Sequence, residues 1–142
     1  MEYLIDVYLT DAENNYRYAL GYQSEKTLFV IGLNPSTACD KTPDNTIRKV
    51  MGLAEYNGYT SFIMLNLYPK RDTYPDDLPD EADKKILEEN LSIIYELDVY
   101  KRQTLYFHSF DYAASMATRF TGLKQSMARV IKRYGIGVIN WC

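Results

Sequence analysis

Cysteine and histidine are scarce in this 142-residue chain, which contains two cysteines and one histidine. A disulfide framework is therefore not expected, and the composition favours a reducing, cytoplasmic environment. No segment approaches the ~20 consecutive apolar residues that cross a bilayer. The first residues also lack the basic and apolar segments of a secretory signal peptide. We expect a cytoplasmic protein that has no membrane partner.

An excess of basic residues is lacking as well. The chain carries 16 lysines and arginines against 19 aspartates and glutamates, which gives a formal net charge of -3. This balance disfavours a strong non-specific grip on nucleic-acid backbones, although it is compatible with a local basic groove. With 46% hydrophobic residues, the chain is long enough for one compact domain over residues 1–142 and too short for two.

The first part of the chain predicts a β-hairpin followed by a buried strand. Tyr3–Leu9 and Tyr16–Tyr22 are rich in β-branched and aromatic residues, and the polar run 10–15 between them suits a turn. The short apolar run Thr27–Leu33 is typical of a strand that is buried on both faces.

A helix and a second buried strand are expected next. The helix would begin near Thr46, with Asp44 or Asn45 as its cap, and Ser61–Leu67 would form the strand. The apolar face of the helix consists of Ile47, Val50, Met51 and Ala54. Because a helix between two such strands makes a right-handed crossover, the two strands should be parallel. We therefore expect a three-layer α/β/α domain with a mainly parallel sheet and an N-terminal antiparallel hairpin.

The last third of the chain combines a predicted helix with a hexamer of unusual sequence. Glu81–Glu96 predicts a second helix, and the hexamer Asp98–Gln103 is similar to the translation of a transposon-end sequencing adapter, a scar found in metagenomic reading frames. We favour the scar over an ordinary solvated helix end, which makes residues 98–142 a chimeric or truncated tail, and we expect poorer packing after Gln103. Taken at face value, the tail contains a strand, a helix and a strand over 104–108, 112–133 and 136–141.

The loop after the first buried strand carries the strongest signal for a site. In open α/β sheets, ligands bind beyond the carboxyl ends of the strands. Gly32 permits a sharp turn or a close approach to a ligand, and Pro35 restrains the backbone of Asn34. Ser36 and Thr37 add hydroxyl and N–H groups that suit an anion or a polar base edge. The alternative is an Asx-type turn in which Asn34 satisfies only its own backbone.

A second polar residue should share the same edge of the sheet. Asn66 ends the second buried strand, and its amide offers a donor and an acceptor in one plane, which suits a base edge. It could equally well end the strand and cap the loop. Arg48 and Arg71 carry guanidinium groups that match phosphate oxygens, although most such charges are simply solvated. We expect no cofactor and no metal, because no further ligand completes a shell around Asp40 and Asp44.

Residues 16 to about 75 resemble the bacterial "domain of unknown function 1643" family. The matching segments keep the order of that family and are Arg17-Tyr18-Ala19-Leu20, Leu33-Asn34-Pro35-Ser36-Thr37-Ala38, Asp44-Asn45-Thr46-Ile47-Arg48 and Asn66-Leu67-Tyr68. Two later segments of the family, Ala-Trp-Gly and a C-terminal His-Pro-Leu, have no counterpart here. The loss begins near the adapter-like hexamer, so it is in keeping with a truncated or chimeric tail.

A more distant resemblance concerns function. Gly32-Leu33-Asn34-Pro35 is similar to the first motif of single-strand-selective and mismatch-specific uracil-DNA glycosylases, and Met64–Pro69 is similar to their base-reading segment. The likeness implies a uracil-DNA-glycosylase-like fold in which Asn34 positions the attacking water and Asn66 reads a flipped base. The second glycosylase motif, His-Pro-Ser-Pro, has no counterpart in this chain.

Together these features predict a domain that binds a nucleobase, a nucleotide or a nucleic acid and hydrolyses an N-glycosidic bond. The alternatives are a non-catalytic nucleotide or nucleic-acid binding module on the same fold, and an inactive fragment. The expected catalytic residue is Asn34. The expected substrate-binding residues are Gly32, Pro35, Ser36, Thr37, Asn66, Arg48 and Arg71.

Overall fold

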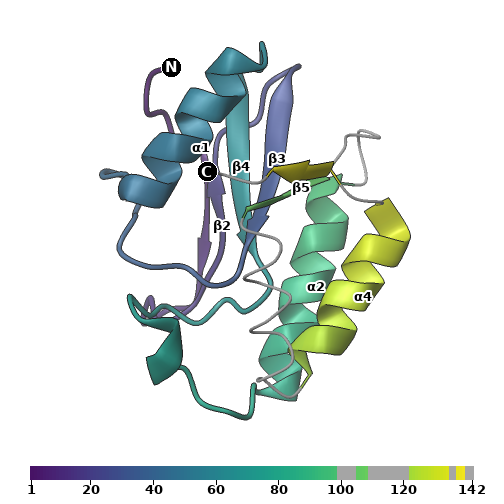
Figure 1. Cartoon of the computed structure of the whole chain (residues 1–142). Coiled ribbons are helices and arrows are strands. Elements are labelled where there is room, and N and C mark those ends of the chain that lie inside the picture. The colour runs from purple at the N-terminus through teal and green to yellow at the C-terminus, as the bar shows by residue number, and fades with distance from the viewer. Residues whose placement is uncertain (99–104, 109–121, 135–136, 140–142) are drawn as a thin grey trace.

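The computed structural model of the chain describes residues 1–98, 105–108, 122–134 and 137–139 (Figure 1). Within these residues, six strands form one sheet and three α-helices pack on it. The strands are β1 (Val7–Thr10), β2 (Arg17–Gly21), β3 (Thr27–Gly32), β4 (Ser61–Asn66), β5 (Leu105–His108) and β6 (Gly137–Ile139). The helices are α1 (Asn45–Tyr56), α2 (Lys84–Asp98) and α4 (Leu123–Tyr134), together with a short 3-10 turn at Pro75–Asp77.

The sheet is mixed, with the strand order β1-β2-β4-β3-β5-β6. The pairs β1–β2 and β2–β4 are antiparallel, whereas β3–β4, β3–β5 and β5–β6 are parallel. The predicted α/β class and the N-terminal hairpin are thus confirmed. The expectation of a mainly parallel sheet is corrected to a mixed sheet, because the hairpin joins the free edge of β4 and contributes antiparallel pairs there.

Helices cover both faces of the sheet (Figure 1). On one face, Ile47, Val50 and Ala54 of α1 pack on alternate residues of the strands, such as Val30 and Met64. On the opposite face, residues of α2 and α4 pack on the other set. None of the helices in the described part of the chain combines the length and the apolar character that a membrane crossing requires.

Carboxylates fix where α1 and α2 begin. Asp44 lies at the N-cap of α1, and its Oδ1 accepts a hydrogen bond of 2.9 Å from the backbone N–H of Ile47. Asp83 plays the same part for α2, where its Oδ1 accepts from the N–H of Lys85 at 2.8 Å. Because a side-chain acceptor satisfies an N–H that lacks an intrahelical partner, these two aspartates set where α1 and α2 begin.

The elements after residue 103 belong to the same sheet and core. β5 lies between β3 and β6 and pairs in parallel with both. Leu123, Met127 and Val130 of α4 are buried in the core that α2 shares. The expectation of a poorly packed tail gains no support from these elements. Residues 99–103 of the adapter-like hexamer, and 109–121 within and before the expected helix, lie outside the described residues.

Two glycines allow the packing of β2 against β4 to be tested. A Cβ placed at Gly21 would lie 2.1 Å from the backbone oxygen of Phe62, whereas a Cβ at Gly52, on the exposed side of α1, would meet nothing within 4 Å. Gly21→Ala is therefore expected to lower the free energy of unfolding by at least about 2 kcal/mol. Gly52→Ala is expected to raise it by about 0.5–1 kcal/mol, because alanine favours the helix. Urea unfolding of both variants measures this difference, and equal effects would contradict the β2–β4 register.

Candidate functional site

The ends of β3 and β4 bring the two sequence motifs together. Gly32 and Asn66 are register partners in the parallel pair, so both motifs leave the sheet at the same edge. The segments that follow the two strands stay hydrogen-bonded to each other. The N–H of Leu67 donates to the carbonyl of Gly32 at 2.9 Å, and the N–H of Tyr68 donates to the carbonyl of Leu33 at 2.8 Å. This edge, with the loop segments 33–44 and 67–72 that follow, is called the carboxyl edge below.

Asn66 has a buried and incompletely satisfied amide. Its relative exposure is 0%. Its Nδ2 donates a long hydrogen bond of 3.4 Å to the carbonyl of Arg17, and its Oδ1 is buried without a hydrogen-bond partner among the described residues. Gly32 lies beside that oxygen, since a Cβ there would lie 3.5 Å from it, and the Met64 side chain fills the space over Gly32, with its Cε 2.6 Å from the same Cβ position. Asn66 therefore has an unpartnered acceptor next to Gly32.

Asn34 ties the two loops of the carboxyl edge together. Its Nδ2 donates to the carbonyl of Asp72 at 2.9 Å, with longer contacts to the carbonyls of Pro35 at 3.2 Å and Lys70 at 3.5 Å. No described residue donates a hydrogen bond to its Oδ1. The amide is thus held by its nitrogen, and its half-buried side chain has the oxygen left as an acceptor.

Arg71 hydrogen-bonds to the loop after β3 and to residues of the β1–β2 hairpin. Its Nη1 donates to the carbonyls of Ser36 at 2.6 Å and Ala38 at 3.1 Å. Its Nη2 donates to the Tyr8 hydroxyl at 2.6 Å, and its Nε donates to Asn14 Oδ1 at 3.1 Å. All of these acceptors are neutral, so Arg71 brings a positive charge to the carboxyl edge without an ion-pair partner among the described residues.

The other predicted site residues make fewer contacts with the two asparagines. Pro35 is buried, Thr37 is exposed, and the Ser36 hydroxyl donates to Thr73 Oγ1 at 3.4 Å. Arg48 is exposed on α1, where its Nη1 donates to Asn45 Oδ1 of the same helix at 3.3 Å. The structure therefore brings the loop residues and Arg71 together around the carboxyl edge, and it leaves Arg48 on the outer face of α1.

Arg17 is a site residue that sequence reasoning missed. It is 2% exposed, its Nη1 donates to the carbonyl of Ala38 at 3.0 Å, and its Nε is buried without a partner. Burial, and next the charge of Arg71, lower the pKa of the Arg17 guanidinium to about 10, so it stays protonated at neutral pH. The signal in the sequence is a charged residue at the start of an otherwise apolar strand.

A β-bulge explains why Arg17 faces α1. In the hairpin, Leu9 pairs with Ala19 but Thr10 pairs with Arg17, so Tyr18 is an extra residue on β2. The Tyr18 hydroxyl donates to Glu89 of α2 at 3.3 Å, which places it on the α2 face. Bulges of this kind re-aim side chains, and here the bulge turns Arg17 toward the loop that leads into α1.

Asn90 of α2 was missed as well. It is 1% exposed, and its Nδ2 donates to the carbonyls of Asn66 at 2.7 Å and Leu67 at 3.2 Å. Its Oδ1 has no partner among the described residues. An asparagine between the buried leucines of a helix was the signal available in the sequence, and its role is to hold the main chain where β4 ends.

Side chains fix the part of the carboxyl edge that leads into α1. Asp44 Oδ2 accepts from the N–H of Ala38 at 3.3 Å, and the Tyr3 hydroxyl donates a short hydrogen bond to the carbonyl of Cys39. Burial, and next the neighbouring Cys39, raise the pKa of Tyr3 to about 12. Both oxygens of Asp44 are occupied by backbone N–H groups, so this carboxylate serves the loop and the helix cap.

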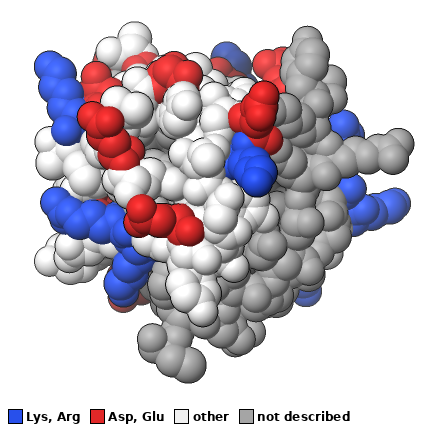
Figure 2. Space-filling view, turned by 90° about the horizontal axis from the view of Figure 1, so that it is seen from above, with Lys and Arg blue, Asp and Glu red and all other residues white. Residues whose placement is uncertain are grey.

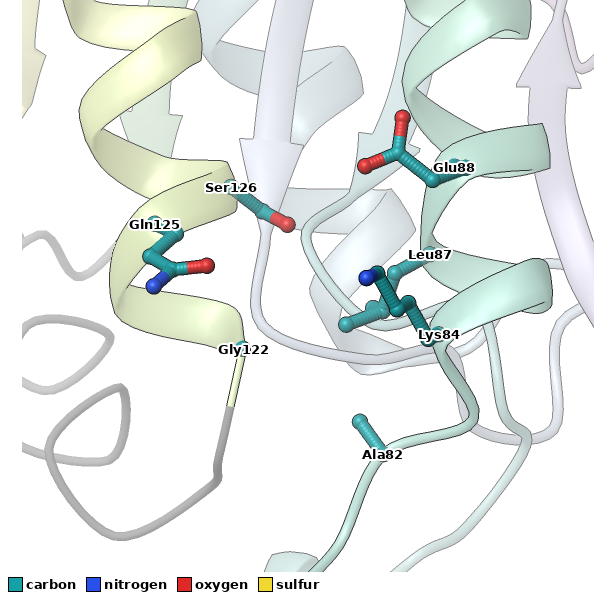
Figure 3. A pocket seen from close by; sticks show the side chains of 7 residues that line it. All are labelled: Ala82, Lys84, Leu87, Glu88, Gly122, Gln125 and Ser126. Atoms are coloured by element: carbon teal, nitrogen blue, oxygen red, sulfur yellow. The ribbon is translucent and has the colours of Figure 1, made fainter.

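A hollow of about 240 Å³ lies between the beginnings of α2 and α4 (Figure 3). Its lining residues are Ala82, Lys84, Leu87, Glu88, Gly122, Gln125 and Ser126. Glu88 is already engaged, since its Oε1 accepts from Arg129 at 2.7 Å. None of the buried polar atoms that lack a partner in the described part lies on this lining. The carboxyl edge is therefore the better candidate for a functional site.

The described residues contain no group of three or more His, Cys, Asp or Glu side chains that could hold a metal ion. On the face where α1 ends and β4 begins, Figure 2 shows Lys and Arg interspersed with Asp and Glu. That face of the described chain therefore presents no continuous positive surface for a nucleic-acid backbone.

Comparison with known proteins identifies the family. No curated protein and no solved structure matches the chain. A family model described as "Protein of unknown function (DUF1643)" matches residues 17–135. The match runs through the adapter-like hexamer and well beyond residue 75, so the interpretation of that hexamer as a scar gains no support from it. It includes the whole of the carboxyl edge and most of the chain, and the protein therefore belongs to the DUF1643 family.

Proposed function

We propose that the protein binds the base of a nucleoside or nucleotide at the carboxyl edge and hydrolyses its N-glycosidic bond. The observation that carries the proposal is the buried amide oxygen of Asn66, which has no hydrogen-bond partner among the described residues. The resemblance of Gly32–Pro35 and Met64–Pro69 to two glycosylase motifs supports the same assignment. It also supports a uracil-DNA-glycosylase-like arrangement of this part of the fold.

The chemistry of Asn66 defines what the ligand must offer. An unsatisfied buried acceptor costs about 1–3 kcal/mol, and a ligand N–H group would remove that cost. Because the Nδ2 of Asn66 has a partner in the carbonyl of Arg17, at 3.4 Å, the buried Oδ1 is the atom that lacks one and that a ligand reaching this edge would satisfy. Uracil and hypoxanthine carry an N–H next to a carbonyl on their Watson–Crick edges, and this N–H donor is what the site would recognise.

Asn34 would serve the hydrolytic step. Its Nδ2 is held by main-chain carbonyls, so its Oδ1 can accept a hydrogen bond from a water and aim the water oxygen. That oxygen forms a bond to the anomeric carbon of the sugar while the C–N bond breaks. The electron pair goes to the base nitrogen, and the water proton passes to the departing base or to solvent. An amide is not basic, so Asn34 contributes position rather than proton abstraction.

A non-catalytic nucleotide-binding module is the second candidate. The contacts of the Asn34 amide with three main-chain carbonyls also suit a residue that only shapes the binding loop. The absence of a His-Pro-Ser-Pro segment from the sequence points the same way. In both candidates a small ligand is favoured over a nucleic acid, because the net charge of -3 opposes binding to a phosphate backbone.

Nucleoside binding tests the proposal. We expect uridine and inosine to bind, and N3-methyluridine to bind about tenfold or more weakly, because methylation removes the N–H donor that Asn66 would accept. Calorimetry measures affinity, and chromatography of the free base measures hydrolysis. Slow release of base is expected without a His-Pro segment. Binding without any release would favour the non-catalytic module, whereas equal affinity for uridine and N3-methyluridine would contradict the role of Asn66.

A further inference from the structure

Two positive charges meet at the carboxyl edge without a carboxylate partner. Arg17 and Arg71 both donate to the carbonyl of Ala38, at 3.0 Å and 3.1 Å. No carboxylate of the described residues forms an ion pair with either guanidinium, and Asp44 is occupied by backbone N–H groups. This pair of side chains is called the arginine pair below.

The environment of Arg17 makes the missing counter-charge costly. A buried charge without a partner is strongly unfavourable. Arg17 is 2% exposed, makes one hydrogen bond and has an unpartnered Nε, although a guanidinium offers five N–H donors. Burial and the charge of Arg71 lower the pKa of Arg17, and the nearby Asp44 carboxylate, which forms no ion pair with it, offsets only part of that effect. Such a group would be expected to be neutralised by something that binds.

The position of the arginine pair relates it to the base site. The carbonyl of Arg17 accepts from Asn66 Nδ2, while its guanidinium reaches Ala38 in the loop that begins with Gly32 and Asn34. Arg71 is only partly buried, so a ligand can approach it from solvent. Arg17 thus contacts the proposed base-reading amide through its main-chain carbonyl, and its guanidinium belongs to the arginine pair.

We propose that the arginine pair is a subsite for a phosphate oxyanion, and that the ligand of the carboxyl edge is a nucleoside monophosphate rather than a nucleoside. This inference rests on the proposed base site for the identity of the ligand. The phosphate-binding part stands on the arginine pair alone. Guanidinium groups bind phosphate oxygens with charge-assisted hydrogen bonds, and Arg71 would meet the oxyanion from the solvent side with the one Nη2 N–H that its four hydrogen bonds leave.

Inorganic phosphate is the first probe. At constant ionic strength, phosphate is expected to raise the midpoint of thermal unfolding relative to chloride, because it binds the folded chain. Arg71→Met is expected to abolish that shift. Arg129→Met is the matched control, since it also removes one arginine charge, and Arg129 lies exposed on α4 in an ion pair with Glu88. Equal shifts in both variants would overturn the subsite.

Uridine monophosphate is the second probe, and it separates this inference from the proposed function. It is expected to bind about tenfold or more tightly than uridine, a preference lost in Arg71→Met and kept in Arg129→Met. Phosphate binding without any uridine binding would contradict the base site and leave the subsite standing. Uridine and its monophosphate binding equally would overturn the subsite and leave the base site standing.

A third arm identifies the source of the phosphate. A short single-stranded oligouridine is expected to bind no more tightly than the monophosphate, because the net charge of the chain is -3. Much tighter binding of the oligonucleotide, with a steep dependence on salt, would overturn the assignment of a small nucleotide. Arg17→Met provides a further check, since it removes the buried charge while Arg71 remains, and it is expected to weaken phosphate binding as well.

Discussion

Replacing Asn66 by leucine is expected to weaken uridine binding by about tenfold to a hundredfold without lowering the free energy of unfolding. Leucine is close to asparagine in shape and removes the buried Oδ1 that has no partner among the described residues. The bond lost from Nδ2 is long, at 3.4 Å, and contributes little. Calorimetry and urea unfolding of the same preparation measure the two effects.

Asn90→Leu is the matched control for this prediction. Its Nδ2 donates two hydrogen bonds to carbonyls at the end of β4, at 2.7 Å and 3.2 Å. Their loss is expected to lower the free energy of unfolding by about 1–3 kcal/mol. If Asn66→Leu destabilised the chain to the same extent and left uridine binding unchanged, Asn66 would be a structural residue like Asn90.

Asn34→Ala is expected to slow base release by about a hundredfold and to change ligand affinity much less. The reason is that a misplaced water affects the transition state, and a loss of positioning can cost that much in rate. The variant also loses the tie between the loops of the carboxyl edge, so its free energy of unfolding should fall by about 1–3 kcal/mol. Single-turnover release, measured where both proteins are folded, gives the rate.

A family relative that carries the His-Pro-Leu segment is the better subject for this rate measurement, because its release is expected to be faster. The same substitution at the residue equivalent to Asn34 should reproduce the effect. An unchanged rate of release in a folded Asn34 variant would remove Asn34 from the chemistry. It would then retain only the loop contacts that the structure shows.

Local patterns predicted most of the first half of the fold. The apolar spacing of α1 and the cap at Asp44 depend only on residues close in sequence, and both are found as expected. The same holds for β3 and β4, whose apolar runs end at Gly32 and Asn66. Because parallel strands align their carboxyl ends, the sequence alone was enough to predict that Asn34 and Asn66 follow strands that end at the same edge of the sheet.

What the sequence could not show depends on irregular or long-range geometry. Strict alternation along β2 assigns Arg17 and Tyr18 to faces that the bulge reverses. Nothing in a period-two pattern indicates such an extra residue. Asn90 is a similar case, because its partners are main-chain carbonyls on another element, 23 and 24 residues away in the sequence. The antiparallel pairing of β2 with β4 likewise could not be inferred from local periodicity.

The most direct test of the base site is an NMR titration with uridine that follows the side-chain amides of Asn34, Asn66 and Gln125 and the backbone amide of Gly32. Saturable shifts are expected at Gly32, Asn34 and Asn66, and they should be much smaller with N3-methyluridine. Gln125 lies on the lining of the hollow between α2 and α4 and should not move. Shifts confined to Gln125, or no shift at the carboxyl edge at saturating uridine, would contradict the base site.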